Sequence, residues 1–315
     1  MVLGGQILRF YSKVFSIFLI FVVYFTYIFL IKEIVFKNEY LVIKKNQSYQ
    51  SIINYNIKDF YINLYFFKTA LRLMLLNDIK IHHGKFKINK NINFIKLIKL
   101  ITLPGNHYEK ITIIEGWEKK ELNNILKSNF KKFEELDYSE VIADTYLFSE
   151  NSSFLEFKSK LKKKYKELKN KYKDDNLLKK FTFKEILIIG SLLEKEGLDY
   201  EDKKKIYSVI INRLNKKMKL QIDATVIYAI TEGYEKFDRK ITYKDLKIEH
   251  IFNTYFINGL PPEPISYVGN KTIELIFENY KTDYLFYFYN SLENKHVFSK
   301  NYKNHLIKLN EYRSK

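Results

Sequence analysis

The chain of 315 residues contains no cysteine. Without thiols it can form neither a disulfide framework nor a metal site with thiolate ligands. This absence does not decide the compartment, because extracytoplasmic domains of this size can fold without disulfide bonds. Hydrophobic residues make up 46% and aromatic residues 17% of the chain, so it can bury a core and wholesale disorder is disfavoured. The length suits one large or two modest domains.

Acidic residues are scarce relative to basic ones. The chain has 36 Asp and Glu against 54 Lys and Arg, a formal charge of +18. Such an excess suits nucleic acid, anionic lipid or an anionic polymer such as cell wall as a partner. Most of the excess is lysine, and Asn, Ile, Tyr and Phe are abundant too, which is typical of an AT-rich coding sequence. We therefore interpret the charge as compositional bias, with a dedicated anion-binding patch as the alternative.

One uncharged run lies near the N-terminus, residues 14–31, VFSIFLIFVVYFTYIFLI. At about 1.5 Å per residue it nearly spans the hydrocarbon core of a bilayer. It is long for a signal peptide, and no small-residue cleavage site follows it. The flanking Lys and Arg residues weakly favour a cytoplasmic N-terminus. We predict a cytoplasmic tail and transmembrane anchor over residues 1–37, with the rest outside the cytoplasm. A cleaved signal peptide and a buried core helix are the alternatives.

The pattern of residues 38–110 indicates a small module that contains both strands and helices. Residues 40–45 alternate as a strand does, and residues 46–57 predict a short helix with a Ser or Asn cap. Residues 67–79 are apolar at helical spacing. The segments GKFKI (84–88) and KITIIEGW (110–117) are predicted to be extended, with a turn at Pro104–Gly105 between them. The Lys-rich residues 157–175 are interpreted as a solvated connecting helix, with a wall- or lipid-facing basic helix as the alternative.

The clearest helical signals begin at residue 181. In FTFKEILIIGSLLEKEG, Thr182 and Glu185 form a capping box and Gly197 marks the end, which predicts a helix of about 14 residues. Further predicted elements are a helix capped by Asp199, a helix capped by Asp223, a proline-rich loop at 253–265, a β-hairpin at 284–298 and a closing helix at 301–313.

Two glutamates, Glu194 and Glu196, close the predicted helix. Successive residues of a helix turn by about 100°, so these side chains point to opposite faces and cannot share a proton. Glu194 follows Gly190 and Ser191 on one stripe, where small residues would leave a notch for a ligand. Because the helix is apolar on nearly all sides, we expect burial to favour the protonated form of Glu194, which suits a general acid. The alternative is a buried ion pair, with Arg213 or Lys217 as the partner.

Five blocks from residue 191 onward resemble one family. They are SLLEKE (191–196), VIINRLNKKMKLQIDATVIYAI (209–230), FNTYFINGLPPEPI (252–265), KTDYLFYF (281–288) and HVFSKNYKNH (296–305). In this order they resemble the YceG-like endolytic murein transglycosylases, the MltG family. The resemblance covers roughly residues 185–305. Upstream, ITIIEGW (111–117) is similar to a strand of the family.

The resemblance implies an α+β fold. Its parts would be a single transmembrane helix, a small LysM-like α/β module over residues 38–110, and a mixed helical and β-hairpin catalytic domain over residues 111–315. It also implies a bacterial inner-membrane enzyme whose extracytoplasmic domain cuts nascent peptidoglycan glycan strands, near cell-wall synthases and without a metal or cofactor. Glu194 would be the catalytic acid and base. The residues implied to line the substrate groove are Ser191, Gln221, Asp223, Thr225, Asn253, Thr254 and Tyr255.

The chain departs from the family pattern at three places. Ile222 and Ala224 stand where the family commonly has Thr and Pro, Gly197 follows the second glutamate, and the segment EVIADTY (140–146) is reduced. Asp223 could instead be a local helix cap, Asn253 a loop hydrogen-bonder and His296 a structural residue of the hairpin. A noncatalytic wall-binding or scaffold protein is the alternative function. A nucleic-acid-binding protein is disfavoured by the apolar run at 14–31.

Overall fold

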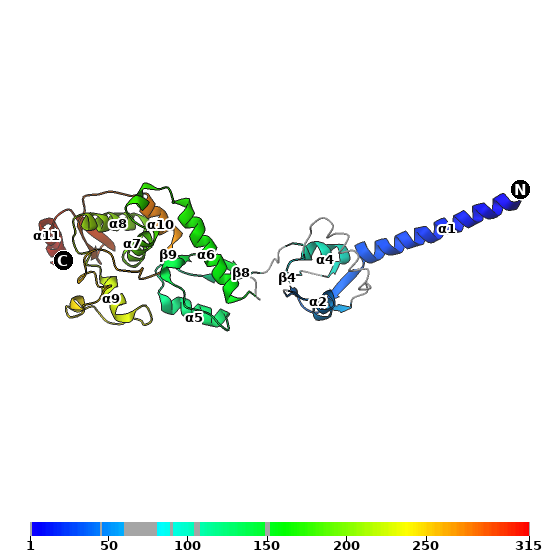
Figure 1. Cartoon of the computed structure of the whole chain (residues 1–315), viewed down its shortest axis with the longest axis horizontal. Coiled ribbons are helices and arrows are strands. Elements are labelled where there is room, and N and C mark those ends of the chain that lie inside the picture. Colours follow the sequence, from blue (N-terminus) through cyan, green and yellow to red (C-terminus); the bar gives the residue numbers. More distant parts are fainter. Residues whose placement is uncertain are drawn as a thin grey trace. The chain divides into compact units, whose positions relative to one another are not determined.

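The computed structural model describes residues 2–44, 46–59, 81–88, 91–103, 108–148 and 152–314, with side chains from residue 10 onward except at Asp59. Helices and strands are mixed along the chain (Figure 1), as the predicted α+β class requires. Two compact units divide it: residues 1–109 with 147–152, and residues 110–146 with 153–315. The predicted helical segment at 67–79 and the turn at Pro104–Gly105 lie outside the described residues.

The chain starts with a long apolar helix. Helix α1 (Val2–Thr26) continues into a π-helical turn, η1 (Tyr27–Ile31). Residues Phe10–Ile31 have a mean hydropathy of 2.7 and none of this segment is buried inside the protein, so it is long and apolar enough to cross a membrane. The end of this helix packs on the first unit, where the Phe29 ring meets the Phe94 ring edge-on at 5.0 Å.

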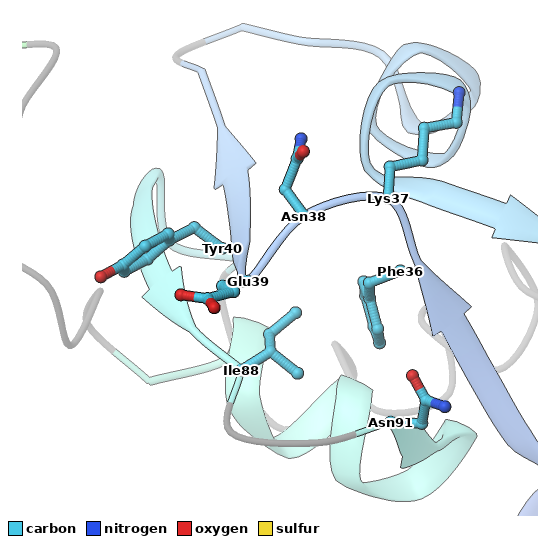
Figure 2. A pocket seen from close by; sticks show the side chains of 7 residues that line it. All are labelled: Phe36, Lys37, Asn38, Glu39, Tyr40, Ile88 and Asn91. Carbon is cyan, nitrogen blue, oxygen red and sulfur yellow. The ribbon is translucent and has the colours of Figure 1, made fainter.

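The rest of the first unit consists of short strands and two described helices. Strand β1 (Glu33–Phe36) pairs with β3 (Ile57–Asp59) and β5 (Ile92–Asn93), and β2 (Tyr40–Ile43) pairs with β4 (Gly84–Lys87), all antiparallel. Helix α2 (Tyr49–Asn56) begins at the predicted cap, Ser48, and α4 (Phe94–Ile101) begins at Asn93. A shallow pocket of this unit is lined by Phe36, Lys37, Asn38, Glu39, Tyr40, Ile88 and Asn91 (Figure 2).

The second unit contains seven helices among its described residues. They are α5 (Lys119–Asn129), α6 (Phe154–Lys171), α7 (Phe183–Glu196), α8 (Tyr200–Asn215), α9 (Asp223–Thr231), α10 (Asn270–Phe277) and α11 (Tyr302–Arg313). Its strand pairs are β7 (Ile142–Ala143) parallel to β9 (Val268–Gly269), and the hairpin of β10 (Phe286–Asn290) and β11 (Lys295–Ser299). Strand β6 (Glu109–Thr112) pairs with β8 (Thr145–Phe148), and the division between the units falls within both strands. Short 3₁₀ turns are η2 (Tyr138–Glu140), η3 (Asn176–Lys179) and η4 (Asp245–Lys247).

Several local predictions for this unit are confirmed. Helix α7 has the predicted 14 residues, and Thr182 and Glu185 form its capping box. The Asp199 side chain accepts a hydrogen bond at the start of α8, and the hairpin and the closing helix are present. The Lys-rich segment is helical too, but α6 buries Phe154, Phe157, Leu161 and Leu168, so it packs against the unit more than a solvated connector would.

Helix α7 lies at the centre of the second unit and packs against α8, α9, α10 and β9 (Figure 1). From Ile186 to Leu193 every residue is buried, because the apolar residues surround the helix on all sides. Gly190 permits the closest of these contacts. A Cβ built there would lie 2.6 Å from a methyl carbon of Val268 on β9.

The variant Gly190→Ala is therefore expected to destabilise the protein by about 2 kcal/mol through overpacking. Denaturant unfolding of the purified protein measures this change. The double variant Gly190→Ala with Val268→Ala makes room for the added methyl group and should recover part of the loss. If Gly190→Ala unfolds at the wild-type denaturant concentration, the contact is not tight.

Candidate active site

Glu194 lies in a buried ion pair. Its side chain is 2% exposed, and its Oε2 pairs with the ammonium of Lys203, on the first turns of α8. Its Oε1 accepts the backbone N–H of Gly269 at 3.1 Å. Lys203 also reaches the Thr272 hydroxyl at 3.3 Å. Both carboxylate oxygens are therefore engaged inside the protein, in a buried ion pair of the kind considered as the alternative role of Glu194.

The partners of this ion pair differ from those predicted. Arg213 is buried instead among backbone carbonyls, donating to Leu285 at 2.7 Å and Leu220 at 2.6 Å. Gly197 does not adopt the left-handed conformation that commonly ends a helix, because its φ is −81°. A Cβ at Gly197 would lie 2.2 Å from the Lys203 side chain, so glycine there lets Lys203 approach α7.

The predicted notch at Gly190 and Ser191 is not open to a ligand. Val268 and Ile276 fill the space at Gly190. Ser191 is fully buried, and its hydroxyl donates to the Ile188 carbonyl at 2.7 Å and accepts the N–H of Ile265 at 3.0 Å. The prediction that Ser191 lines the groove is wrong, since its side chain holds the loop after the prolines against α7.

Glu196 points to a different environment, as the helical rotation predicts. The hydroxyl of Tyr287, on β10, donates to Glu196 Oε2 at 3.1 Å. Burial raises the pKa of Glu196 and the negative charge of Asp223 raises it further, against the opposing effects of Tyr287, His296 and the Ala224 N–H. A carboxyl whose pKa is raised retains a proton closer to neutral pH, which is the property of a general acid.

Asp223 and Tyr255 lie beside Glu196. The Tyr255 hydroxyl donates to Asp223 Oδ1 at 2.6 Å, and burial together with this carboxylate raises the pKa of Tyr255, which keeps it a donor. The predicted cap role of Asp223 is wrong, because α9 begins after Ile222 and no side chain caps it. Gln221 is exposed with φ +52°, and its N–H donates to the Thr254 carbonyl at 3.2 Å. Asp223 and Tyr255 are therefore brought together near the Glu196 carboxyl, whereas the recorded contact of Gln221 is with the loop at Thr254.

Three further residues predicted to line the groove are fully buried: Thr225, Asn253 and Thr254. The hydroxyls of Thr225 and Thr254 lie 2.9 Å apart, and Thr254 Oγ1 accepts the N–H of Ile222 at 2.9 Å. The Asn253 side chain donates to two carbonyls of its own loop. These buried side chains make their recorded contacts inside the protein, where they fix the loop that carries Tyr255.

One residue that contacts Glu196, Tyr287, was not singled out by the sequence. Tyr287 meets Glu196 across more than ninety positions of sequence, and only the hairpin register places it there. His296 Nδ1 lies 2.8 Å from Asp202 Oδ2, which supports the structural role considered for this histidine. Lys195, between the two glutamates, pairs with Glu118. Among the described residues no group of three His, Asp or Glu side chains is placed to hold a metal ion.

Comparisons with known proteins add to this geometry. The chain is 40% identical over 134 residues to an endolytic murein transglycosylase of Bacillus subtilis (strain 168), a match covering 42% of this chain and 36% of that protein. It is 34% identical over 132 residues to an endolytic murein transglycosylase of Streptococcus pneumoniae (D39), covering 40% of this chain and 23% of that protein. The chain thus matches little more than a third of these curated relatives at most.

A solved structure of a yceG-like protein from Listeria monocytogenes has the same fold. Its TM-score is 0.52 at 24% identity, and the superposition covers 85% of this chain and 97% of that one. The YceG-like family model matches residues 41–311, which include most of the first unit's core and the whole candidate site. The chain belongs to the YceG-like family.

Proposed function

We propose that the protein is an endolytic murein transglycosylase that cleaves the β-1,4 bond between MurNAc and GlcNAc in nascent glycan strands. The products would be 1,6-anhydroMurNAc ends, and strand elongation would terminate. The observation that carries the proposal is the Glu196 carboxyl, whose pKa is raised beside Asp223 and the Tyr255 hydroxyl. The names of the Bacillus and Streptococcus relatives support the same reaction.

Glu196, in place of Glu194, is assigned the acid and base role. Glu194 has both oxygens occupied inside the protein and is 2% exposed, so a glycosidic oxygen cannot reach it without breaking the pair with Lys203. Glu196 accepts hydrogen bonds from the Tyr287 hydroxyl and the Ala224 N–H, which are neutral donors, so no ion pair has to be broken before it meets a substrate. A group that must release and then recover a proton needs such access to substrate.

One carboxyl is sufficient for the reaction. Protonated Glu196 donates its proton to the glycosidic oxygen, the bond from MurNAc carbon 1 to that oxygen breaks, and GlcNAc leaves with a free hydroxyl. The neighbouring N-acetyl group of MurNAc can stabilise the positive charge that develops at carbon 1. Ionised Glu196 then takes the proton of the MurNAc carbon-6 hydroxyl as its oxygen attacks carbon 1. The ring closes to the anhydro sugar, and Glu196 is protonated again without consuming water.

Digestion of purified glycan strands tests this function. Mass spectrometry of the products is expected to find new anhydro ends within strands that were previously intact. Strands that bind the protein and stay uncut would favour the alternative, a noncatalytic peptidoglycan-binding or scaffold protein.

The first unit is proposed to be a LysM-like module that holds the glycan. The antiparallel pair of β2 and β4 with helix α2 supports this reading. Figure 2 shows Phe36, Ile88 and Asn91 around one shallow pocket, an arrangement of aromatic and amide groups that suits a sugar ring. Removal of the Phe36 ring is then a natural probe of glycan affinity.

Helix α1 is proposed to anchor the protein in the bacterial cytoplasmic membrane as a single pass, with the catalytic domain outside the cytoplasm. Deleting residues 1–31 is expected to move the protein from the membrane fraction to the soluble fraction, because Phe10–Ile31 is the apolar segment. Fractionation with an alkaline wash, which strips peripheral proteins, measures the change. A full-length protein recovered soluble from the cytoplasm would contradict both the anchor and the wall substrate.

A further inference from the structure

A closed ring of contacts surrounds the end of helix α7. The Tyr287 hydroxyl donates to Glu196 Oε2 at 3.1 Å, and the Tyr287 ring stands edge-on to His296 at 5.4 Å. His296 Nδ1 lies 2.8 Å from Asp202 Oδ2. The same Asp202 oxygen accepts the N–H of Leu198, two residues after Glu196, at 3.1 Å. The ring therefore joins α7, α8 and both hairpin strands, and it closes on the backbone two residues after Glu196.

The histidine and the aspartate of this ring are shielded from water. The side chains of His296 and Asp202 are 6% and 11% exposed. Hydrogen bonds to a carboxylate are stronger where water is excluded, so this pair fixes the hairpin against α8. Asp202 is itself fixed, because its N–H donates to the Asp199 cap at 2.8 Å. Burial and the charge of Glu196 keep the pKa of Tyr287 well above its usual value, so Tyr287 stays an O–H donor.

We propose that Tyr287 and the Asp202–His296 pair are positioning residues, which hold the Glu196 carboxyl in the orientation in which it gives and takes the proton. This inference rests on the role proposed for Glu196. None of the three needs to touch the substrate. Tyr287 acts directly on the carboxyl, whereas Asp202 and His296 act through the Tyr287 ring and through the backbone that follows Glu196.

The charges around Glu196 determine the expected pH dependence. Tyr287 faces it from β10, His296 from β11 and Asp223 from the start of α9. Tyr255 lies beside Asp223, and Arg213 on α8 lies near both tyrosines. A hydroxyl that donates to a carboxylate stabilises its ionised form. Losing the Tyr287 hydroxyl should therefore raise the pKa of Glu196. Because the first step needs the protonated acid, activity would then persist to higher pH.

Tyr287→Phe and Tyr289→Phe form a matched pair for the test. Both remove a hydroxyl from β10, but the Tyr289 hydroxyl donates to Asn294 in the hairpin turn, away from the carboxyl. Rates on purified glycan strands are measured across pH. Tyr287→Phe is expected to lower kcat about tenfold with KM within about twofold, and to move the basic limb of the profile to higher pH. Tyr289→Phe is expected to behave as wild type.

His296→Asn and His296→Ala test the second part of the ring. An Asn amide nitrogen can take the place of Nδ1 and donate to Asp202, so Asn should retain more kcat than Ala at equal melting temperature. If Tyr287→Phe matches Tyr289→Phe in kcat and pH profile while Glu196→Gln is inactive, the positioning role is overturned and the proposed function stands. If Glu196→Gln is fully active, the role of Glu196 and this inference fall together.

Discussion

Glu196→Gln is expected to lower kcat on glycan strands by about a thousandfold, while the protein stays folded. An amide cannot give a proton to the glycosidic oxygen or take one from the carbon-6 hydroxyl, and general acid–base catalysis contributes about 10²–10⁴-fold. The release of anhydro products by purified protein, followed by mass spectrometry, measures the loss. Retention of more than about a tenth of the wild-type rate would contradict the assignment of Glu196.

The stability of this variant supplies the control. The folded-state pKa of Glu196 is raised, so its ionisation opposes folding, and this penalty appears as the pH rises above the pKa of an exposed glutamate. Glutamine carries no such penalty. We expect Glu196→Gln to melt no lower than wild type at neutral pH. Any gain in melting temperature should shrink as the pH falls toward the pKa of an exposed glutamate. A loss of activity without a loss of stability would then show that the substitution affects the chemical step and not the fold.

Glu194→Ala is expected to destabilise the protein by about 3 kcal/mol. It leaves the Lys203 ammonium, which is 18% exposed, without its carboxylate partner, and breaking a buried pair from one side is strongly destabilising. Denaturant unfolding measures the loss. The activity of the fraction that remains folded is expected to stay within a fewfold of wild type, because Glu194 faces away from the site.

A double replacement separates lost charge from lost packing. Glu194→Leu with Lys203→Met replaces both charged groups by apolar ones of similar volume, and such exchanges are often neutral or stabilising. It should recover most of the stability that Glu194→Ala loses. An inactive but fully stable Glu194 variant would contradict this account and return the acid role to Glu194.

The sequence predicted elements whose signals are local. Helix α7 has its predicted length because Thr182, Glu185 and the apolar run all lie within it. The cap at Ser48, the cap at Asp199 and the hairpin are equally local. No strand was predicted in residues 118–180, where β7 and β8 are only two and four residues long. Periodicity has little to act on in such short segments.

The choice between the two glutamates could not be made locally. Helical rotation separates them correctly, but their roles depend on partners distant in sequence: Lys203 and Gly269 for one, Tyr287 for the other. The prediction of an open notch was wrong for the same reason, since Val268 from a distant strand fills the space at Gly190. Motif resemblance likewise marked Thr225 and Thr254, whose side chains are buried supports of the loop. A motif locates a site, but it does not distinguish the residues that contact the substrate from those that support the fold around it.

The central claim is that the protein cleaves glycan strands with the sugar's own hydroxyl in place of water. Digestion of purified strands in water enriched in ¹⁸O, followed by mass spectrometry of the new ends, tests it most directly. The account predicts 1,6-anhydroMurNAc ends that carry no ¹⁸O, and none of these ends with Glu196→Gln. Reducing MurNAc ends that contain ¹⁸O would show hydrolysis by water and would contradict it.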